Sequence, residues 1–198
     1  MRSVNPGLSA GHDSAGAEVS DPSSAQVLRF WFDLQPRDWF VKNPDFDAKV
    51  RSRFLALHEA AAAGRLAPWA DEARSCLALV IALDQFPRNM FRGEARAFAT
   101  DPLALAAARV ILQRAWNKQL LPSERLFAYL PFEHSEALED QNLSCELMQD
   151  FEPEQYRYAL RHRDIIQRFG RFPHRNDILG RQSTPAEIEF LKLPGSGF

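Results

Sequence analysis

Apolar residues recur at intervals of three and four positions through most of the 198-residue chain, and no stretch alternates strictly between apolar and polar residues. Intervals of three and four place side chains on one face of an α-helix, whereas strict alternation is typical of a half-buried β-strand. The pattern predicts eight helices, over about residues 24–32, 44–63, 71–85, 102–117, 123–130, 134–150 and 153–169, with the last one beginning at Ser183 or Thr184.

The predicted helix ends carry residues that favour starting or stopping a helix. Asn43 is a suitable N-cap before Pro44, and Gly64 and Gly170 suit the left-handed residue that follows a helix. Pro87 is expected to end the third helix, because proline has no N–H to donate and its ring clashes with the preceding turn.

Eight helices joined by short connections predict an all-α fold in which neighbouring helices pair as antiparallel hairpins. The third helix is apolar around nearly its whole circumference, so we expect it to be central. A strict 34-residue repeat is absent, and any stack of hairpins is therefore degenerate. Residues 24–198 are expected to form a single helical domain, after a tail over residues 1–23 whose polar, Gly-, Ser- and Pro-containing composition indicates disorder.

The composition excludes several classes of protein. Apolar residues make up 45% and charged residues 25% of the chain, which is ordinary globular usage. The net charge of −2 gives no reason to expect nucleic acid or a membrane surface as a partner. No apolar run approaches the length of a membrane-spanning helix. Cys76 and Cys145 are too few for a disulfide scaffold, and we expect both to be reduced in a cytoplasmic protein.

Three of the predicted helices each place an ionisable residue on a row of otherwise apolar side chains. Asp84 continues the row of the third helix, His134 begins the row of the sixth, and His162 lies within the row of the seventh. Burying a polar group without a partner costs about 1–3 kcal/mol, and an unpaired charge costs more. Each of these residues is therefore expected to have a partner.

Two loops that follow helices supply candidate partners, and they resemble each other. The first contains F-P-R-N and the second F-P-H-R-N, so each delivers an Arg-Asn pair directly after Phe-Pro. Arginine forms charge-assisted, often bidentate bonds with carboxylates and phosphates, and we predict that Arg88, Arg171 and Arg175 hold an anionic small molecule or a peptide carboxylate. The candidate ligand-binding residues are Arg88, Asn89, Arg168, Arg171, His174, Arg175 and Asn176.

The embedded carboxylates and histidines allow two further interpretations. In an enzyme, His134 or His162 would be the general acid or base, tuned by Asp84 or Glu136. In a purely structural arrangement, Asp84 and the acidic residues of the segment 133–136 would instead pair with the loop arginines and hold the loops on the bundle. Whether the protein is an enzyme stays open at this point, as does a third possibility, a protein-interaction scaffold, which predicts an exposed apolar groove.

No motif indicates a metal ion or a cofactor, and none is expected. The H-E-x-x-H arrangement and cysteine pairs at zinc spacing are absent. The nucleophile motif G-x-S-x-G and the glycine-rich phosphate loops are also absent.

Five ordered stretches, LDQFPRNMFRG, AFATD, PFEHSE, RFGRFPHRN and LGRQSTPAE, resemble the bacterial domain-of-unknown-function 924 family over about residues 27–193. The resemblance implies stacked antiparallel helix pairs similar to those of tetratricopeptide-repeat proteins. It implies no reaction and no catalytic role. The motif positions that it implies are Asp84, Gln85, Arg88, Asn89, Thr100, Asp101, His134, Ser135, Glu136, Arg168, Arg171, Arg175 and Asn176.

Overall fold

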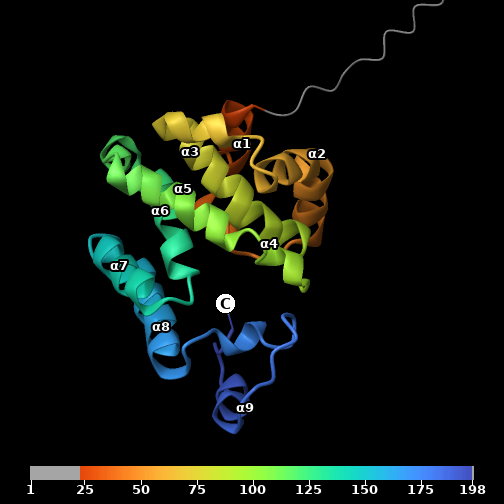
Figure 1. The fold of residues 1–198 in the computed structure, drawn as a ribbon, viewed down its shortest axis with the longest axis vertical. Helices are drawn as coiled ribbons and strands as arrows, with labels where there is room; N and C mark the ends of the chain where they lie inside the picture. The colour runs from red at the N-terminus through yellow and green to blue at the C-terminus, as the bar shows by residue number, and fades with distance from the viewer. Residues whose placement is uncertain (1–22, 198) are drawn as a thin grey trace, which may run out of the picture.

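The computed structural model describes residues 23–197, which contain helices and no β-strand (Figure 1). The prediction of an all-α fold is confirmed. The α-helices are α1 (Ser24–Phe32), α2 (Pro44–Ala62), α3 (Ala73–Val80), α4 (Phe86–Met90), α5 (Asp101–Gln113), α6 (Pro122–Glu133), α7 (Leu138–Met148), α8 (Pro153–Phe169) and α9 (Pro185–Leu191). A π-helical turn (Ile81–Gln85) joins α3 to α4, and a 3-10 turn (Pro173–Arg175) follows α8.

Several helix ends form where the sequence predicts them. The Asn43 side chain accepts hydrogen bonds from the second and third backbone N–H groups of α2. Gly170 ends α8 with a φ of 69°, a conformation that favours glycine. The predicted tail over residues 1–23 lies outside the described residues except for Ser23, whose side chain caps α1.

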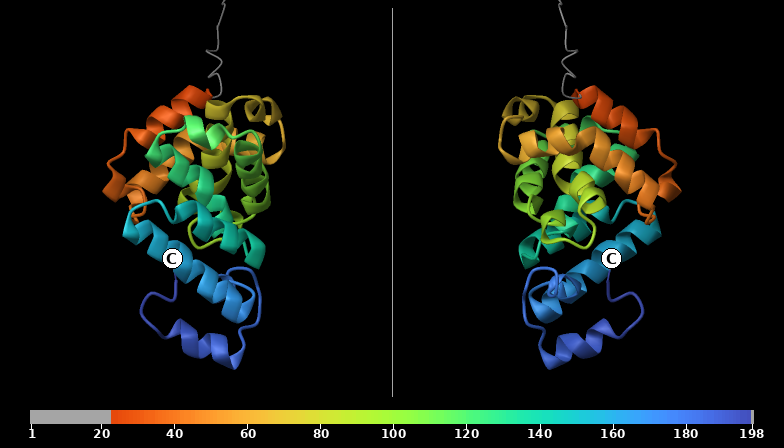
Figure 2. Two further views of the ribbon diagram at one scale, coloured as in Figure 1. Left: turned by 90° about the vertical axis from the view of Figure 1, so that its left-hand side faces the viewer. Right: turned by 90° about the vertical axis from the view of Figure 1, so that its right-hand side faces the viewer.

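The helices α1 to α6 gather into one body, with α7 and α8 packed together along one edge and α9 farthest from α1 (Figures 1 and 2). As predicted, α3 is central, in contact with α1, α5 and α6. Aromatic side chains fill the main core, in which the rings of Phe54 and Phe86 stack at 4.6 Å and those of Trp31 and Phe127 meet edge to face at 5.4 Å. Cys76 and Cys145 are both free and buried.

The third predicted helix does not stop before Pro87. The chain passes from α3 through the π turn into α4 with right-handed helical backbone at Ile81 and Gln85, so the three pieces form one continuous rod. Within the π turn, the Phe86 N–H donates to the Ile81 carbonyl, five residues earlier. Because α3 and α4 belong to one rod, the helices between residues 23 and 197 correspond to the eight that the sequence predicts.

The helix tolerates Pro87 because side chains bind the carbonyls that precede it. His58 Nδ1 donates to the Ala82 carbonyl at 2.9 Å, and Thr100 Oγ1 donates to the Leu83 carbonyl at 2.6 Å. The next carbonyl, that of Asp84, accepts from Arg88 Nη1 at 2.7 Å. These donors come from other parts of the chain or from the following turn, so the local pattern around Pro87 did not reveal them.

Replacing Thr100 with valine should therefore lower the free energy of unfolding by about 1–3 kcal/mol, because the buried Leu83 carbonyl loses the hydroxyl that donates to it. Thr100→Ser keeps the hydroxyl and should cost less than about 1 kcal/mol. Urea denaturation of both variants measures the difference. Equal losses in the two variants would show that the hydroxyl contributes nothing to the π turn.

The predicted boundary between the fifth and sixth helices is also wrong. The fifth runs on through Pro131 to Glu133, and the sixth begins only at Leu138, so His134 is the C-cap residue of α6 and does not lie on a row of α7. The buried side chain of Phe132 lies just beyond Pro131 in this helix. Fully burying a phenylalanine contributes about 1.5–3 kcal/mol, which offsets the hydrogen bond that proline cannot form. The fourth predicted helix ends early, at Gln113, because Ala115 adopts a left-handed conformation.

Candidate functional site

Five polar side chains from separate parts of the chain meet in one buried network. Asp84 comes from the π turn, Arg88 from α4, Asp101 from the start of α5, His134 from the end of α6, and Arg175 from the 3-10 turn after α8. Their side chains are between 0 and 20% exposed. The network therefore joins the main helical body to the segment that follows α8.

Asp84 is the centre of this network and is fully buried. Its Oδ1 lies 2.7 Å from His134 Nδ1 and 3.3 Å from Arg88 Nη1, and its Oδ2 accepts from the Gln85 side chain. Burial by itself would raise the pKa of Asp84, but the positive Arg88 and the hydrogen bond from His134 outweigh it and hold the pKa well below its usual range. Asp84 is therefore an ionised carboxylate at neutral pH.

An ionised Asp84 determines which nitrogen of His134 carries the proton. A carboxylate only accepts hydrogen bonds, so His134 Nδ1 must be the donor and the neutral ring must keep its lone pair on Nε2. Burial lowers the pKa of His134, and Arg88 lowers it further, although Asp84 acts in the opposite direction. At neutral pH the ring is therefore a neutral base, and its side chain is 15% exposed.

The two arginines of the network are already paired within the chain. Arg88 binds Asp101 through two bonds, of 2.8 and 3.0 Å. Arg175 Nη1 lies 3.3 Å from Asp101 Oδ2, and its Nη2 donates to the His134 carbonyl at 3.1 Å. The guanidinium of Arg175 also lies between the rings of Phe98 and Phe172, at 4.6 and 4.5 Å, and burial lowers its pKa to about 10. Two carboxylates thus balance two guanidinium groups.

A second histidine–carboxylate pair lies next to the first. Glu133 Oε1 is 3.3 Å from His162 Nδ1, which also lies 2.9 Å from the Tyr158 carbonyl. The rings of His134 and His162 are 6.5 Å apart. Burial and the negative Asp84 raise the pKa of Glu133 to about 8, whereas burial lowers the pKa of His162 to about 3. The structure thus brings together three of the predicted candidates, Asp84, His134 and His162.

Glu136, the fourth catalytic candidate, has a different role. It accepts two bonds from Arg181, of 2.7 and 3.0 Å, and one of 2.8 Å from the backbone N–H of Phe172. Burial opposes the ionisation of Glu136, but the bonds from Arg181 lower its pKa overall. Glu136 therefore holds the segment after α8 in place by binding Arg181 and the backbone of Phe172.

The predicted ligand-binding residues do not all converge on the network. Asn89 donates to Asp47 Oδ1 on α2 at 2.8 Å, and Asn176 donates to Ser183 Oγ at 2.9 Å. His174 lies close to Phe172, with ring centroids 5.6 Å apart, and burial lowers its pKa to about 4. These side chains hold loops against neighbouring segments.

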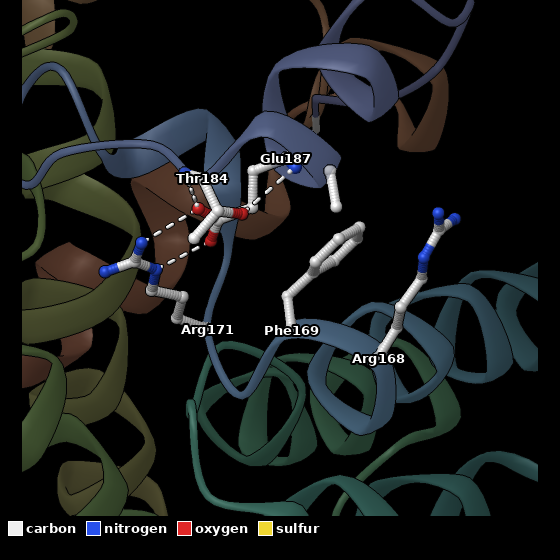
Figure 3. Close-up of a pocket in the computed structure, with 6 residues that line it drawn as sticks. Arg168, Phe169, Arg171, Thr184 and Glu187 are labelled. Carbon is white, nitrogen blue, oxygen red and sulfur yellow. Dashed lines mark hydrogen bonds and ion pairs between the residues drawn. The ribbon is translucent and has the colours of Figure 1, made fainter.

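Arg171 and Arg168 line a hollow of their own between the end of α8 and the start of α9. Arg171 binds Glu187 at 2.7 and 2.8 Å, whereas Arg168 extends on the far side of Phe169 (Figure 3). The prediction that Arg171 joins Arg88 and Arg175 around one anion is therefore not met by the geometry. Each of the three guanidinium groups pairs with a carboxylate of the chain instead.

The residues that sequence reasoning left out of its candidate sites are Asp101, Arg181 and Glu133. Asp101 and Arg181 lie in AFATD and LGRQSTPAE, two of the stretches that resemble the family. That resemblance is the signal in the sequence that could have identified these two residues. Within residues 23–197, no group of three or more His, Cys, Asp or Glu residues is arranged to hold a metal ion. The helices of the same segment include none that is long and apolar enough to cross a membrane.

Comparisons with known proteins agree with the resemblance. A family model described as a bacterial protein of unknown function, DUF924, matches residues 27–195. The chain is also similar to the solved structure of a protein of unknown function from Agrobacterium tumefaciens, with 44% sequence identity and a TM-score of 0.83. That similarity covers 85% of this chain and 96% of the other. No curated protein matches the chain.

Proposed function

Because the chain belongs to the DUF924 family of bacterial proteins of unknown function, we propose from its own geometry that it is an enzyme with an acid–base site at His134. In this proposal, a small anionic molecule binds beside His134 and exchanges a proton with Nε2. Asp84 orients the ring and stabilises its positively charged form. Arg88 and Arg175 stay bound to Asp101, and their positive charges attract the anion.

The observation that carries this proposal is the 2.7 Å contact between Asp84 Oδ1 and His134 Nδ1. A buried carboxylate at Nδ1 fixes the tautomer and orientation of a histidine and stabilises the imidazolium that forms when Nε2 takes a proton. Since Arg88 and Gln85 also hold Asp84, the carboxylate has a defined direction. Histidines that act as general bases are oriented in this way.

The charge balance of the network supports an anionic partner. Asp84 and Asp101 cancel Arg88 and Arg175, so a proton on His134 leaves one unbalanced positive charge inside the protein. An anion bound beside the ring would neutralise that charge. We therefore expect the anion and the proton to bind together, more strongly at pH 6 than at pH 8.

A thermal-shift measurement with inorganic phosphate, pyruvate, succinate and citrate tests the proposal. At pH 6, at least one of these anions should raise the melting temperature of the unmodified protein by several degrees, and the rise should disappear in His134→Gln. His58→Gln is the matched control, because His58 is also buried but binds the Ala82 carbonyl. Equal rises with and without the His134 ring, or no rise with any of the anions, would count against the proposal.

A further inference from the structure

The outer side of α7 carries a row of negative charges. Glu139 and Glu146 lie on the helix, Asp150 follows directly after it, and all three side chains are exposed. They are spaced by about two helical turns and then one, so they share one side of the helix. The opposite side buries Gln141 and Met148. In the part of the chain that the structure describes, none of the three carboxylates forms an ion pair.

The outer side of α8 carries a row of positive charges. Arg157 and Arg168 are exposed and lie about three helical turns apart on one side of the helix. Arg168 extends from the end of α8, away from the neighbouring Arg171–Glu187 pair (Figure 3). Within residues 23–197, neither Arg157 nor Arg168 is bound to a carboxylate. The row therefore presents unbalanced positive charge to solvent.

The two rows lie level with each other on one helical hairpin. The helices α7 and α8 are joined by a short turn and pack side by side, so they run antiparallel (Figure 1). Burial raises the pKa of the Cys145 thiol on α7, and the positive Arg163 on α8 acts against that rise, so these two residues face each other across the hairpin. Counting outward from them places the ends of the two rows level to within about one residue, Glu139 with Arg168 and Asp150 with Arg157.

The rows do not neutralise each other within the chain. Between residues 23 and 197, no ion pair joins a carboxylate of α7 to an arginine of α8, and the carboxylate of Asp164 on α8 binds Arg163 of the same helix. Axes of packed helices are about 8–10 Å apart, and side chains on their outer sides point away from the contact between them. One surface therefore carries two parallel rows of opposite charge, and we call it the α7–α8 face.

We propose that the α7–α8 face binds the same face of a second copy of the chain. A two-fold axis parallel to the two helices places α7 of each protomer against α8 of its partner. Because the rows are level, Glu139 then meets the partner's Arg168, and Asp150 meets the partner's Arg157. The symmetry forms each of these pairs twice. This inference does not depend on the proposed function.

The charge pattern favours a second copy over other partners. The acidic row would repel an acidic protein or a nucleic acid, and the basic row would repel a basic protein. A partner that satisfies both rows must carry both signs at the same separation, which the chain's own face does. Leu138 and Tyr158, which are 39% and 44% exposed, each adjoin a charged residue of the face, and the partner would cover them.

Sedimentation of the full-length protein at several salt concentrations tests the proposal. The unmodified protein should form a dimer at about 0.3 mM protein in 0.1 M salt. Raising the salt to 1 M shortens the Debye length from about 10 Å to about 3 Å, so the dissociation constant should rise by about tenfold or more. A protein that stays monomeric at both salt concentrations, or a dimer that salt does not weaken, would overturn the proposal.

Charge reversal gives a second, more specific measurement. Glu139→Arg with Asp150→Arg places arginines opposite arginines in the dimer, whereas Arg157→Glu with Arg168→Glu places carboxylates opposite carboxylates. Each double variant alone should therefore be monomeric in 0.1 M salt. An equal mixture of the two restores all the pairs between unlike chains, so it should form a dimer again.

The matched control is Lys42→Glu with Arg65→Glu, which reverses two exposed positive charges at the ends of α2, away from α7 and α8 (Figure 1). It should dimerise as the unmodified protein does. All the substitutions are at exposed positions, and circular dichroism checks that each variant is folded. A dimer that survives either reversal, or a mixture of folded variants that stays monomeric, would contradict the proposal and leave the anion response of His134 unaffected.

Discussion

Replacing Asp84 with alanine is expected to lower the free energy of unfolding by about 3–5 kcal/mol, which is typical of breaking a buried ion pair. Asp84 is fully buried and is the shared acceptor for Arg88, His134 and Gln85. Its loss leaves Asp101 to balance Arg88 and Arg175, so one positive charge stays unpaired in the interior. Urea denaturation followed by circular dichroism measures the change.

The control for this variant is Asp38→Ala, which removes an aspartate from an exposed ion pair. Asp38 lies 3.8 Å from Arg37, and both side chains are largely in solvent. Exposed pairs contribute about 0–1 kcal/mol, so the control should be nearly as stable as the unmodified protein. If Asp84→Ala is as mild as this control, the network is not the buried, mutually dependent unit described above. Asp84→Asn keeps the size of the side chain but also removes its charge. It should lower the free energy of unfolding by less than Asp84→Ala does.

Replacing Arg175 with alanine should cost about 3 kcal/mol, because the change removes a buried charge pair and a guanidinium packed between two aromatic rings. Asp101 keeps only Arg88 as a partner, and the His134 carbonyl loses the N–H that donates to it. Arg175→Lys should lose nearly as much, because an ammonium group cannot bind both acceptors and stack as a planar guanidinium does. Hydrogen exchange should accelerate at the backbone of residues 171–181.

Arg168 supplies the control for this variant. It is also an arginine over a phenylalanine, at 4.7 Å from the Phe169 ring, but it is exposed. Arg168→Ala should change the free energy of unfolding by less than about 0.5 kcal/mol. If Arg175→Ala leaves both stability and hydrogen exchange unchanged, Arg175 does not help to hold the segment after α8.

The sequence predicts those residues of the site that lie on a row of otherwise apolar side chains along a helix. Asp84 and His162 interrupt apolar rows, and the cost of burying them correctly indicated that each would have a partner. The position of His134 was predicted for the wrong reason, because it caps α6 and does not lie on α7. Its partner, Asp84, is 50 residues away, a distance at which local patterns carry no information.

Two other features depend on how distant segments meet. The π turn exists because His58 and Thr100 bind carbonyls that Pro87 cannot satisfy, and neither residue is near it in sequence. Glu136 pairs with Arg181, not with Arg171, because the path of the chain after Gly170 brings Arg181 back to it. The anionic partner, the cytoplasmic location, the scaffold alternative and the tetratricopeptide-like stacking stay predictions.

Nitrogen NMR of the His134 ring tests the acid–base account most directly, with the signals assigned by their loss in His134→Gln. The account predicts that, at pH 8, Nδ1 carries the proton and Nε2 is bare. On acidification, Nε2 should gain a proton with a midpoint below the usual 6.5, and a bound anion should raise that midpoint. A ring with its proton on Nε2 and a bare Nδ1 facing Asp84 would contradict it, because no basic nitrogen would then be directed away from the carboxylate.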